Sequence, residues 1–561
     1  MLSQIREHIF ETDVLVVGGG LAGNNAAIAA LERKAKVIIA EKASLERCGA
    51  IAGGVDHFMA YLNTAPWDTR EAYLEYVAKI ARGAINIKIQ DAVFCRELED
   101  ALERMERIGC TLKQSDGTYF RTRALGQPGP YFINFNGKNL KPALAREAKR
   151  LGVKVIEKCM ITDLLFDGDK VIGALGFNIR TGDFYIIKSK ATILATGCTT
   201  RLFQNPTGLP FNTWQCPADT GGAQVMAFKV GAKLANMEYM RITVVPKGFS
   251  AAGLNALTGM GGRFINARGE EFMKRYHPMG DKAPRSALVE AVIKEIQKGN
   301  GPIYIDCTHL SKSEIDHLNK TLGYDKDTLP DFLQQKGIDL SKDPLEVMYS
   351  EGMQAGPAEV CGSGIMIDED TSSSVKGLFG AGDCTDQMRC VHVCTTGGYL
   401  AGKKAVEYAQ GLSYLPKNDV KEIQKIKSSI YVPLTKKDGI PFQIIENTIR
   451  RIMWDYAGPV RNEKSLKVAI QKLEMLSEEA EKLKAKDFHE LMRVHEAKQI
   501  LEVGKIMCHA SLERKETRFG VFHFRSDYPE TREEFEGEIV IWQENGKIKK
   551  EFKKLDYTKI I

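Results

Sequence analysis

The sequence has no run of about 18 apolar residues, the length that a membrane-spanning helix requires. Its first residues form no apolar segment of the kind that directs export. The 12 cysteines include no Cys-x-x-Cys pair, so a self-contained four-cysteine iron–sulfur or zinc site is not expected. We therefore predict a cytoplasmic chain with reduced thiols, no bound metal and no direct membrane span.

Charge of one sign is not in large excess. The chain has 78 basic and 72 acidic side chains and a net charge of +6, which is a smaller and less localised imbalance than nucleic-acid binding proteins show. The basic run Lys547 to Lys554 is interpreted as a solvated face. A length of 561 residues with 43% hydrophobic content predicts two or three domains.

The N-terminal segment of residues 12–42 has the pattern of a βαβ unit. Asp13 to Val17 is an apolar run typical of a buried parallel strand, and an Ala-rich helix is predicted from Leu21 to Arg33. A second strand is predicted from Lys36 to Ala40. Further strands are expected at residues 153–156, 170–178, 183–187, 192–195 and 377–381, helices at 95–112 and 139–152, and a hairpin at 537–552.

The turn between the first strand and the helix, Gly18 to Gly23, matches the G-x-G-x-x-G dinucleotide motif in its expected context. Gly18 permits the tight turn, Gly20 lets a pyrophosphate approach the helix N-terminus, and Gly23 permits close helix–strand packing. Glu41 ends the second strand, where an acidic side chain accepts hydrogen bonds from the adenosine ribose.

Two later segments favour FAD over NAD. Residues 191–197 end in Ala195-Thr196-Gly197, and residues 377–383 end in Gly382-Asp383; both resemble the returning strands of large FAD-binding domains. In such domains the last acid contacts the ribityl chain, which makes Asp383 the candidate here. No second G-x-G-x-x-G stands in a βαβ context, so a separate NAD(P) domain is not expected.

Motifs along nearly the whole chain identify a family. They occur in family order, and the sequence resembles the fumarate reductase and succinate dehydrogenase flavoproteins, with an N-terminal part most similar to the alpha subunit of adenylylsulfate reductase. The matching segments are ETDVLVVGGG (11–20), EKASLERCGA (41–50), FNTW (211–214), DTGG (219–222), GRFINARGEEFM (262–273), DKAPRS (281–286), GLFGAGDC (377–384), RKETR (514–518) and HFRSDYP (523–529).

The resemblance implies an α/β fold in which a Rossmann-type FAD-binding domain is interrupted by an α+β capping domain and followed by a mainly helical C-terminal domain. The predicted bounds are 1–244 and 351–415 for the FAD-binding domain, 245–350 for the cap and 416–561 for the C-terminal domain. The resemblance further implies chemistry at flavin N5, in the cleft between the cap and the FAD-binding domain. It also implies a partner subunit that is a ferredoxin-like iron–sulfur protein.

The matching segments also suggest further cofactor contacts. Lys42, Cys48 and Asp219 fall within them, and Thr396, in the region after GLFGAGDC (377–384), is a further predicted contact. Gly49 stands where many membrane-bound relatives have the histidine that links the flavin covalently. We therefore predict that FAD is bound non-covalently.

The substrate residues of the dicarboxylate enzymes are not retained. Their two histidines, an arginine and a Thr-Glu pair correspond here to Thr243, Glu359, Thr395, Leu254 and Asn255. Neutral or acidic groups at these positions remove charge-assisted hydrogen bonds, and a carboxylate at position 359 would repel a dianion. Fumarate and succinate are accordingly not expected to be substrates.

Three further side chains are candidates for the flavin and substrate pocket. Arg285 lies in the motif that carries a proton-delivering arginine in dicarboxylate reductases, and the alternative is a surface or cap-hinge arginine. Arg241 would stabilise an anionic flavin or substrate, or would form a structural ion pair with Glu238. Trp214 would stack on flavin or substrate, or belong to the core.

The loop that contains Cys390, His392 and Cys394 is expected near the isoalloxazine ring. A thiolate paired with His392 could attack flavin or a substrate sulfur, whereas buried cysteines are more often inert. The predicted catalytic set is therefore Arg285, Arg241, Trp214, His392 and Glu359.

Three functions remain open at this stage. The first is a flavoprotein subunit that exchanges electrons between a small molecule and an iron–sulfur subunit, with adenylylsulfate reductase-type chemistry as the leading option. The second is a stand-alone oxidase or dehydrogenase of the aspartate oxidase type. The third is an electron-transfer subunit without a substrate of its own.

Overall fold

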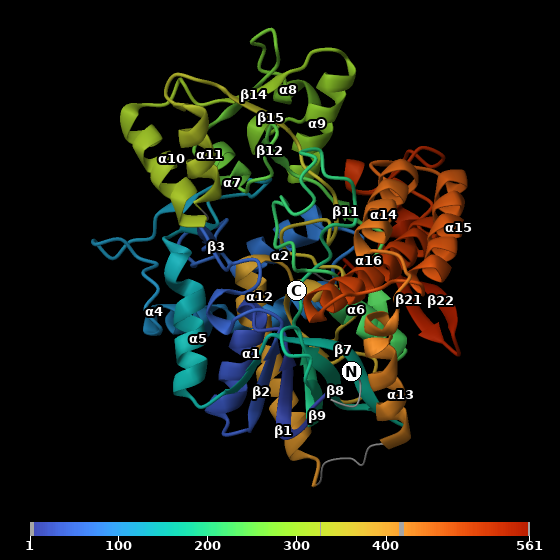
Figure 1. The fold of residues 1–561 in the computed structure, drawn as a ribbon. Helices are drawn as coiled ribbons and strands as arrows, with labels where there is room; N and C mark the ends of the chain where they lie inside the picture. Colours follow the sequence, from blue (N-terminus) through green and yellow to red (C-terminus); the bar gives the residue numbers. More distant parts are fainter. Residues whose placement is uncertain (1–4, 326, 414–419, 559–561) are drawn as a thin grey trace.

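The computed structural model describes residues 5–325, 327–413 and 420–558. The first four residues and the predicted domain junction between residues 415 and 416 lie outside these ranges. The described chain forms a mixed α/β fold with three parts. They are a sheet-based FAD-binding domain, a cap above it and a mainly helical C-terminal part beside it (Figure 1).

The core of the FAD-binding domain is a seven-stranded sheet in the order β6-β2-β1-β9-β8-β7, with β18 paired to β9. Its parallel strands are apolar and fully buried where they approach the cofactor motif, as at Val14 to Val17 of β1. The strands are β1 (Glu7–Val17), β2 (Val37–Glu41), β6 (Lys154–Glu157), β7 (Cys159–Asp167), β8 (Lys170–Asn178), β9 (Phe184–Leu194) and β18 (Leu378–Gly380).

Two predicted strands, residues 183–187 and 192–195, are one continuous strand, β9. The polar residues between them, Lys188 to Lys190, suggested an interruption. In the structure Lys188 lies opposite Glu11 of β1, with 3.5 Å between Nζ and Oε1, and Lys190 Nζ lies 3.0 Å from Asp13 Oδ1. Ion pairs between neighbouring strands therefore allow the charged stretch to continue the sheet. Strand β7 was not predicted.

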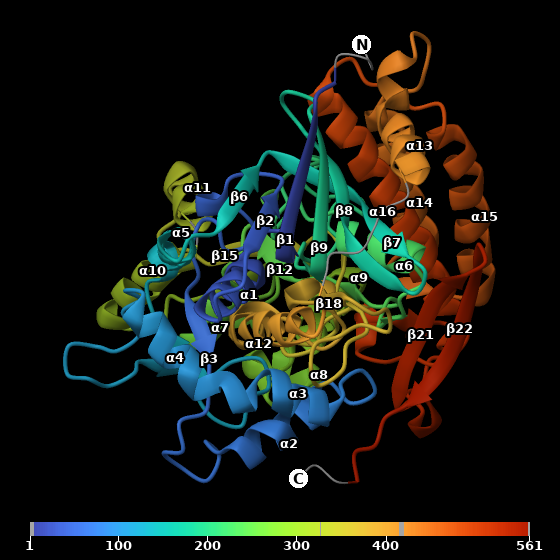
Figure 2. The same cartoon turned by 90° about the horizontal axis from the view of Figure 1, so that it is seen from below.

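Helix α1 (Leu21–Glu32) packs closely against helix α12 (Cys390–Gln410), as Figure 2 also shows. The contact requires glycine. A β-carbon at Gly398 would lie 2.6 Å from the carbonyl oxygen of Ala22, and one at Gly402 would clash with the carbonyl of Ala26. This close packing places the N-terminal ends of both helices at the same cavity.

The remaining elements of the FAD-binding domain surround this pair. The helix predicted at residues 95–112 is shorter in the structure. A 3₁₀ turn occupies Cys95–Glu97, and the helix itself begins at Leu98 and ends at Arg107. The elements are β3 (His57–Met59), α2 (Arg70–Ile80), α3 (Ile87–Val93), α4 (Leu98–Arg107), β4 (Arg121–Thr122), β5 (Phe132–Asn134), α5 (Leu140–Arg150), α6 (Gly222–Lys229), β10 (Leu234–Ala235), β11 (Met240–Arg241), β16 (Met353–Gln354) and β17 (Gly364–Ile365).

The cap contains an antiparallel sheet in the order β12-β15-β14-β13, with helices around it. It lies at the top of Figure 1 and contacts the FAD-binding domain through the Lys138–Asp327 ion pair, in which Nζ and Oδ1 are 2.6 Å apart. Its elements are β12 (Val244–Pro246), α7 (Leu254–Gly259), β13 (Arg263–Ile265), α8 (Met273–Tyr276), α9 (Arg285–Gln297), β14 (Ile303–Asp306), α10 (Lys312–Asp325), α11 (Thr328–Lys336) and β15 (Leu345–Tyr349).

The C-terminal part is mainly helical and ends in the predicted hairpin. Asn545 and Gly546 both have positive φ, as a two-residue hairpin turn requires. The basic strand β22 is exposed along most of its length. The elements are α13 (Val420–Tyr431), α14 (Phe442–Ala457), β19 (Val460–Arg461), α15 (Glu463–Ala480), α16 (Phe488–Glu513), β20 (Phe524–Arg525), β21 (Gly537–Glu544) and β22 (Lys547–Lys554).

Candidate active site

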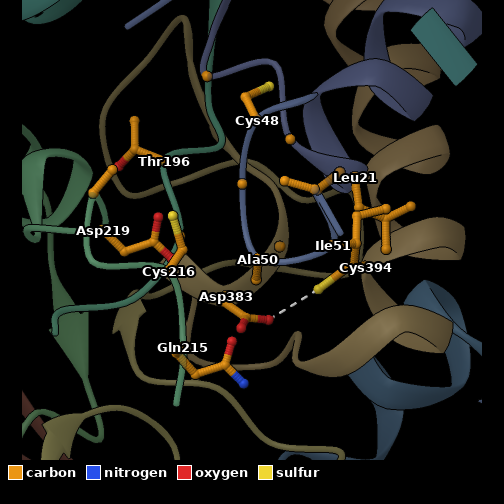
Figure 3. Close-up of a pocket in the computed structure, with 18 of the residues that line it drawn as sticks. Leu21, Cys48, Ala50, Ile51, Thr196, Gln215, Cys216, Asp219, Asp383 and Cys394 are labelled. Atoms are coloured by element: carbon orange, nitrogen blue, oxygen red, sulfur yellow. Dashed lines mark hydrogen bonds between the residues drawn. The ribbon is translucent and has the colours of Figure 1, made fainter. Parts of the chain in front are cut away.

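A cavity of about 380 Å³ extends from the N-terminus of α1 to the cap. Figure 3 shows side chains from distant segments around it, including Thr196, Asp219 and Asp383. Of the residues predicted from sequence, those that line the cavity are Gly18, Gly20, Glu41, Lys42, Cys48, Gly49, Ala195, Thr196, Gly197, Trp214, Asp219, Arg241, Arg285, Glu359, Gly382 and Asp383.

The glycine turn forms a cradle at one end of the cavity. A β-carbon added at Gly20 would meet no atom within 4 Å, so the space above this residue is open. Helix α1 has no side-chain cap and no acidic residue in its first turn, which leaves its first N–H groups available to an anion. Gly23 faces the strand instead, where a β-carbon would clash with the carbonyl of Gly18.

Glu41 is buried beside this turn. Its Oε2 accepts a hydrogen bond from the N–H of Gly19 at 2.6 Å, and its Oε1 accepts one from the N–H of Ala43 at 2.7 Å. The carboxylate therefore holds the glycine turn in place as well as facing the cavity. The neighbouring Lys42 is already bound, since its Nζ lies 2.6 Å from Oε1 of Glu496 on α16.

The middle of the cavity contains two carboxyl groups. Gly197, with φ of +78°, leaves room for Asp219, whose carboxylate would lie 2.7 Å from a β-carbon at that position. Burial, reinforced by the negative charge of Asp383, raises the pKa of Asp219 to about 8. Asp219 is therefore mainly protonated at neutral pH and can donate a hydrogen bond to a cofactor oxygen.

The cysteines near Asp383 are not activated. Asp383 Oδ1 accepts hydrogen bonds from Cys394 Sγ at 3.1 Å, the dashed line in Figure 3, and from the N–H of Cys390 at 3.2 Å. Burial raises the pKa of Cys390 to about 11, and burial also raises the pKa of Cys394 and Cys48. These thiols stay protonated at neutral pH, which disfavours the reactive-thiolate interpretation.

At the cap end, Glu359 bridges two arginines. Arg285 Nε donates to its Oε1 at 2.8 Å, and Arg241 Nη2 donates to its Oε2. Burial alone would raise the pKa of Glu359, but the two guanidinium groups outweigh burial and hold it well below its usual range. The expectation that Glu359 would repel an anion is therefore wrong, because its charge is compensated twice.

The contacts of the two arginines exclude two of the structural alternatives, the ion pair with Glu238 and a surface position for Arg285. Glu238 pairs with Arg514 at 2.6 Å between Oε1 and Nε, so the proposed Arg241–Glu238 ion pair is wrong. Arg285, at the start of α9, is buried rather than a surface residue and also donates to Asn255 Oδ1 at 2.7 Å and to Thr243 Oγ1. Its guanidinium lies 5.8 Å from the ring centroid of Trp214.

His392 and Thr396 do not line the cavity. The His392 ring packs edge-on against Phe58 and Phe94, and burial lowers its pKa to about 3. Thr396 donates its hydroxyl to the carbonyl of His392 within α12. Both predicted site residues therefore belong to the interior beside the cavity, where the sequence spacing could not distinguish one side of the helix from the other.

Sequence reasoning missed several lining residues, among them Arg389, Asp56 and His57. Arg389, which precedes α12, is buried and has its Nε and Nη1 without a hydrogen-bond partner in the described structure, with Nη1 3.7 Å from Asp383 Oδ2. Asp56 and His57 face the cavity from the FAD-binding domain. An arginine directly before a long helix was the available signal for Arg389, whereas no pattern marked Asp56 and His57.

These features fit FAD along the cavity. The open cradle at Gly20 suits a pyrophosphate, Glu41 suits a ribose, and the groups from Asp219 to Arg389 provide donors for the rest of the cofactor.

The described residues contain no cluster of three or more metal-binding side chains. No helix in the described ranges is both long and apolar enough to span a bilayer.

We predict that Glu41→Gln weakens FAD binding by about 1–3 kcal/mol, because a buried charge-assisted hydrogen bond is lost. Titration of the apoprotein with FAD measures this. Glu157→Gln is the matched control: Glu157 lies opposite Glu41 on β6 and accepts from Leu45 N–H at 2.8 Å, but does not line the cavity. Equal FAD affinity in both variants would refute the assignment.

We also predict that FAD is released when the holoprotein is precipitated with acid, because Gly49 offers no side chain for a covalent bond. The measurement is flavin absorbance in the supernatant and on the pellet. Flavin that stays with the denatured chain would show a covalent link at another residue.

Comparisons with known proteins agree with this geometry. A family model described as "FAD binding domain" matches residues 13–396, and one described as "Fumarate reductase flavoprotein C-term" matches residues 446–561. An uncharacterized FAD-dependent oxidoreductase of Methanocaldococcus jannaschii is 29% identical over 568 residues, covering 98% of each chain. One subunit of the CoM/CoB fumarate reductase of Methanothermobacter marburgensis is 27% identical over 576 residues, covering 98% of this chain and all of that one.

The same relationship appears among solved structures. Adenylylsulfate reductase from Archaeoglobus fulgidus matches with a TM-score of 0.89 and 28% identity, over 100% of this chain and 98% of that one. The predicted fold, with its FAD-binding, capping and C-terminal helical parts, is confirmed. The chain thus belongs to the fumarate reductase and succinate dehydrogenase flavoprotein family and is an FAD-dependent oxidoreductase.

Proposed function

We propose that the protein is a flavoprotein subunit that exchanges two electrons between a small anionic substrate and an iron–sulfur partner subunit. The observation that carries the proposal is the convergence of Arg241, Arg285 and Arg389 on one cavity, with Glu359 compensating only part of their charge. Bound FAD would supply both two-electron chemistry toward the substrate and one-electron steps toward the clusters.

The arginines have a binding and orienting role. Arg285 is fixed by Glu359, Thr243 and Asn255, so its guanidinium is held rigidly at the cap side of the cavity. Arg389 has unpaired donor atoms and lies beside Asp383 on the FAD-binding side. An anion between the two sides would be held by groups that are already ordered, which lowers the entropic cost of binding.

Two substrate types suit this site. The relationship to adenylylsulfate reductase supports a sulfur anion, and the relationship to the CoM/CoB fumarate reductase supports an unsaturated carboxylate. The sequence argument against fumarate depended on the loss of cationic groups. Since three arginines line the cavity, charge no longer excludes a carboxylate, and both types belong in the test.

The proposal of an iron–sulfur partner is supported by two features: the described residues hold no metal-binding cluster, and the sequence has no second dinucleotide motif. A partner protein with clusters would give the electrons an outlet. The names of two relatives designate them as subunits. The alternative is a stand-alone oxidase, in which oxygen would accept the electrons.

We expect the reduced holoenzyme to be reoxidised anaerobically by at least one anion from a panel of adenylylsulfate, fumarate and related 2-enoic acids. Arg285→Gln should slow that reaction about 100-fold or more, as the loss of one ordered donor to a reacting anion does. Arg275→Gln is the control, because Arg275 is an exposed cap arginine paired with Glu270. No reoxidation by any anion, or equal rates in both variants, would refute an anionic substrate at this site.

We further expect the native protein, purified anaerobically, to contain iron and a second, smaller polypeptide as well as FAD. Iron and flavin are measured in the same fractions as activity. A fully active preparation with FAD but without iron would contradict the subunit proposal and favour the stand-alone oxidase.

A further inference from the structure

Asp56 and His57 form a hydrogen-bonded pair on the wall of the cavity that faces the cap. His57 Nδ1 lies 2.6 Å from Asp56 Oδ1. A carboxylate can only accept a hydrogen bond, so Nδ1 carries the proton and Nε2 is the nitrogen that changes protonation state. The ring is held against Phe132, with centroids 4.0 Å apart, where strands β3 and β5 pair.

The surroundings of His57 favour its charged form. Burial lowers the pKa of His57, but the charge and hydrogen bond of Asp56, together with the charges of Asp325 at the end of α10 and of Glu359, outweigh burial. Behind it, His392 on α12 is neutral, because burial lowers its pKa to about 3. The positive charges of Arg241 and Arg285 are both engaged by Glu359. The net result is a pKa above the ordinary value.

Other groups at this end of the cavity are poor proton donors. The Arg285 side chain donates to Glu359, Thr243 and Asn255 at once, and a guanidinium stays charged at physiological pH. Burial raises the pKa of the Cys390 thiol to about 11. Among the described residues that line the cavity, His57 is the only imidazole.

The cap contacts the chain just before this pair. Gly54, with φ of +144°, has no room for a side chain, because a β-carbon there would lie 2.5 Å from the carbonyl oxygen of Asp325 and 2.6 Å from that of Tyr324. The end of α10 therefore rests on the loop that leads into Asp56 and His57. From this position at the end of α10, the negative charge of Asp325 favours the protonated form of His57.

From this arrangement we propose that His57 is a catalytic residue that exchanges a proton with the substrate, and that Asp56 is its positioning residue. The inference rests on the proposed function and narrows the substrate to an anion that gains or loses two carbon-bound hydrogens. In the reductive direction, one carbon of an activated double bond receives a hydride equivalent from the reduced cofactor. The adjacent carbon takes the proton from Nε2 of His57.

The balance of this step is complete. The carbon–carbon π bond, the Nε2–H bond and the bond that holds the hydride on the reduced cofactor break, two C–H bonds form, the substrate is reduced and the cofactor would be oxidised. The imidazole is left neutral, with its Nδ1–H still bonded to Asp56, and a solvent proton restores the imidazolium. In the oxidative direction the neutral imidazole accepts the proton. Adenylylsulfate, which is split by two electrons without forming a C–H bond, does not need this group.

The first experiment measures the protonation state of His57 without substrate turnover. In the FAD-loaded holoenzyme with ¹³C-labelled histidine, the imidazole signal that disappears in His57→Gln should titrate above about 6.5, the ordinary histidine value. In Asp56→Asn the midpoint should move to lower pH, because the favourable carboxylate charge is gone. A midpoint at or below the ordinary value, or one that does not move in Asp56→Asn, would overturn the inference.

A second experiment reads the reaction. The reduced holoenzyme is mixed with fumarate and with a panel of 2-enoic acids, and the reoxidation rate should fall as pH rises through the His57 pKa. His57→Gln should lose about 100-fold or more in rate, together with this alkaline limb, as the loss of a general acid does. In Asp56→Asn the limb should shift to lower pH.

His317→Gln is the matched control. His317 also packs against a phenylalanine, with its ring centroid 4.2 Å from that of Phe120, but it lies on α10 outside the cavity. It should keep the wild-type rate and pH profile, and all variants are compared at equal FAD content. A His57→Gln profile identical to the control overturns the inference while the proposed function stands.

The two proposals can fail separately. Reoxidation by adenylylsulfate alone would overturn the role of His57 and leave the anionic substrate intact. Reoxidation by no anion would overturn the proposed function, and with it the catalytic role of His57.

Discussion

The buried bridge from Arg241 through Glu359 to Arg285 is the interaction on which the site depends. It joins β11, the loop after β16 and the first turn of the cap helix α9, three segments that are far apart in the sequence. Removal of one partner from a buried ion pair costs about 3–5 kcal/mol, because it leaves an uncompensated charge. The bridge therefore ties the position of the cap to the charge of the cavity.

The charge balance of this bridge explains how an acidic residue can stand in the proposed anion-binding site. Glu359 alone would repel a negative substrate. Between two guanidinium groups it instead orients both of them and leaves the cluster positive. Arg389 adds a third positive charge from the start of α12, where the helix N-terminus also favours an anion. The cluster of Arg241, Glu359 and Arg285 is consequently positive although the side chain between the two arginines is a carboxylate.

At the cofactor end, the shape of the cavity is set by backbone atoms rather than by side chains. Close packing of α1 on α12 through Gly398 and Gly402 brings two helix N-termini to one cavity. Glu41 fixes the glycine turn through the N–H of Gly19. Such a cradle recognises phosphate and ribose groups by geometry, which is why it is compatible with many substrates at the other end.

Local patterns in the sequence sufficed for the parts of the protein that are built from neighbouring residues. The βαβ unit, the G-x-G-x-x-G turn, Glu41 at the end of β2 and the Asn545-Gly546 hairpin all depend on spacing over a few residues, which periodicity reveals. Only the tertiary structure decided that Glu359 is paired with two arginines, that His392 faces the interior and that β9 is continuous. These depend on partners that are distant in the sequence, such as Glu11, which is 177 residues from Lys188, and Phe58, which packs against His392. A side chain's charge and direction follow from such partners, and no pattern along the chain encodes them.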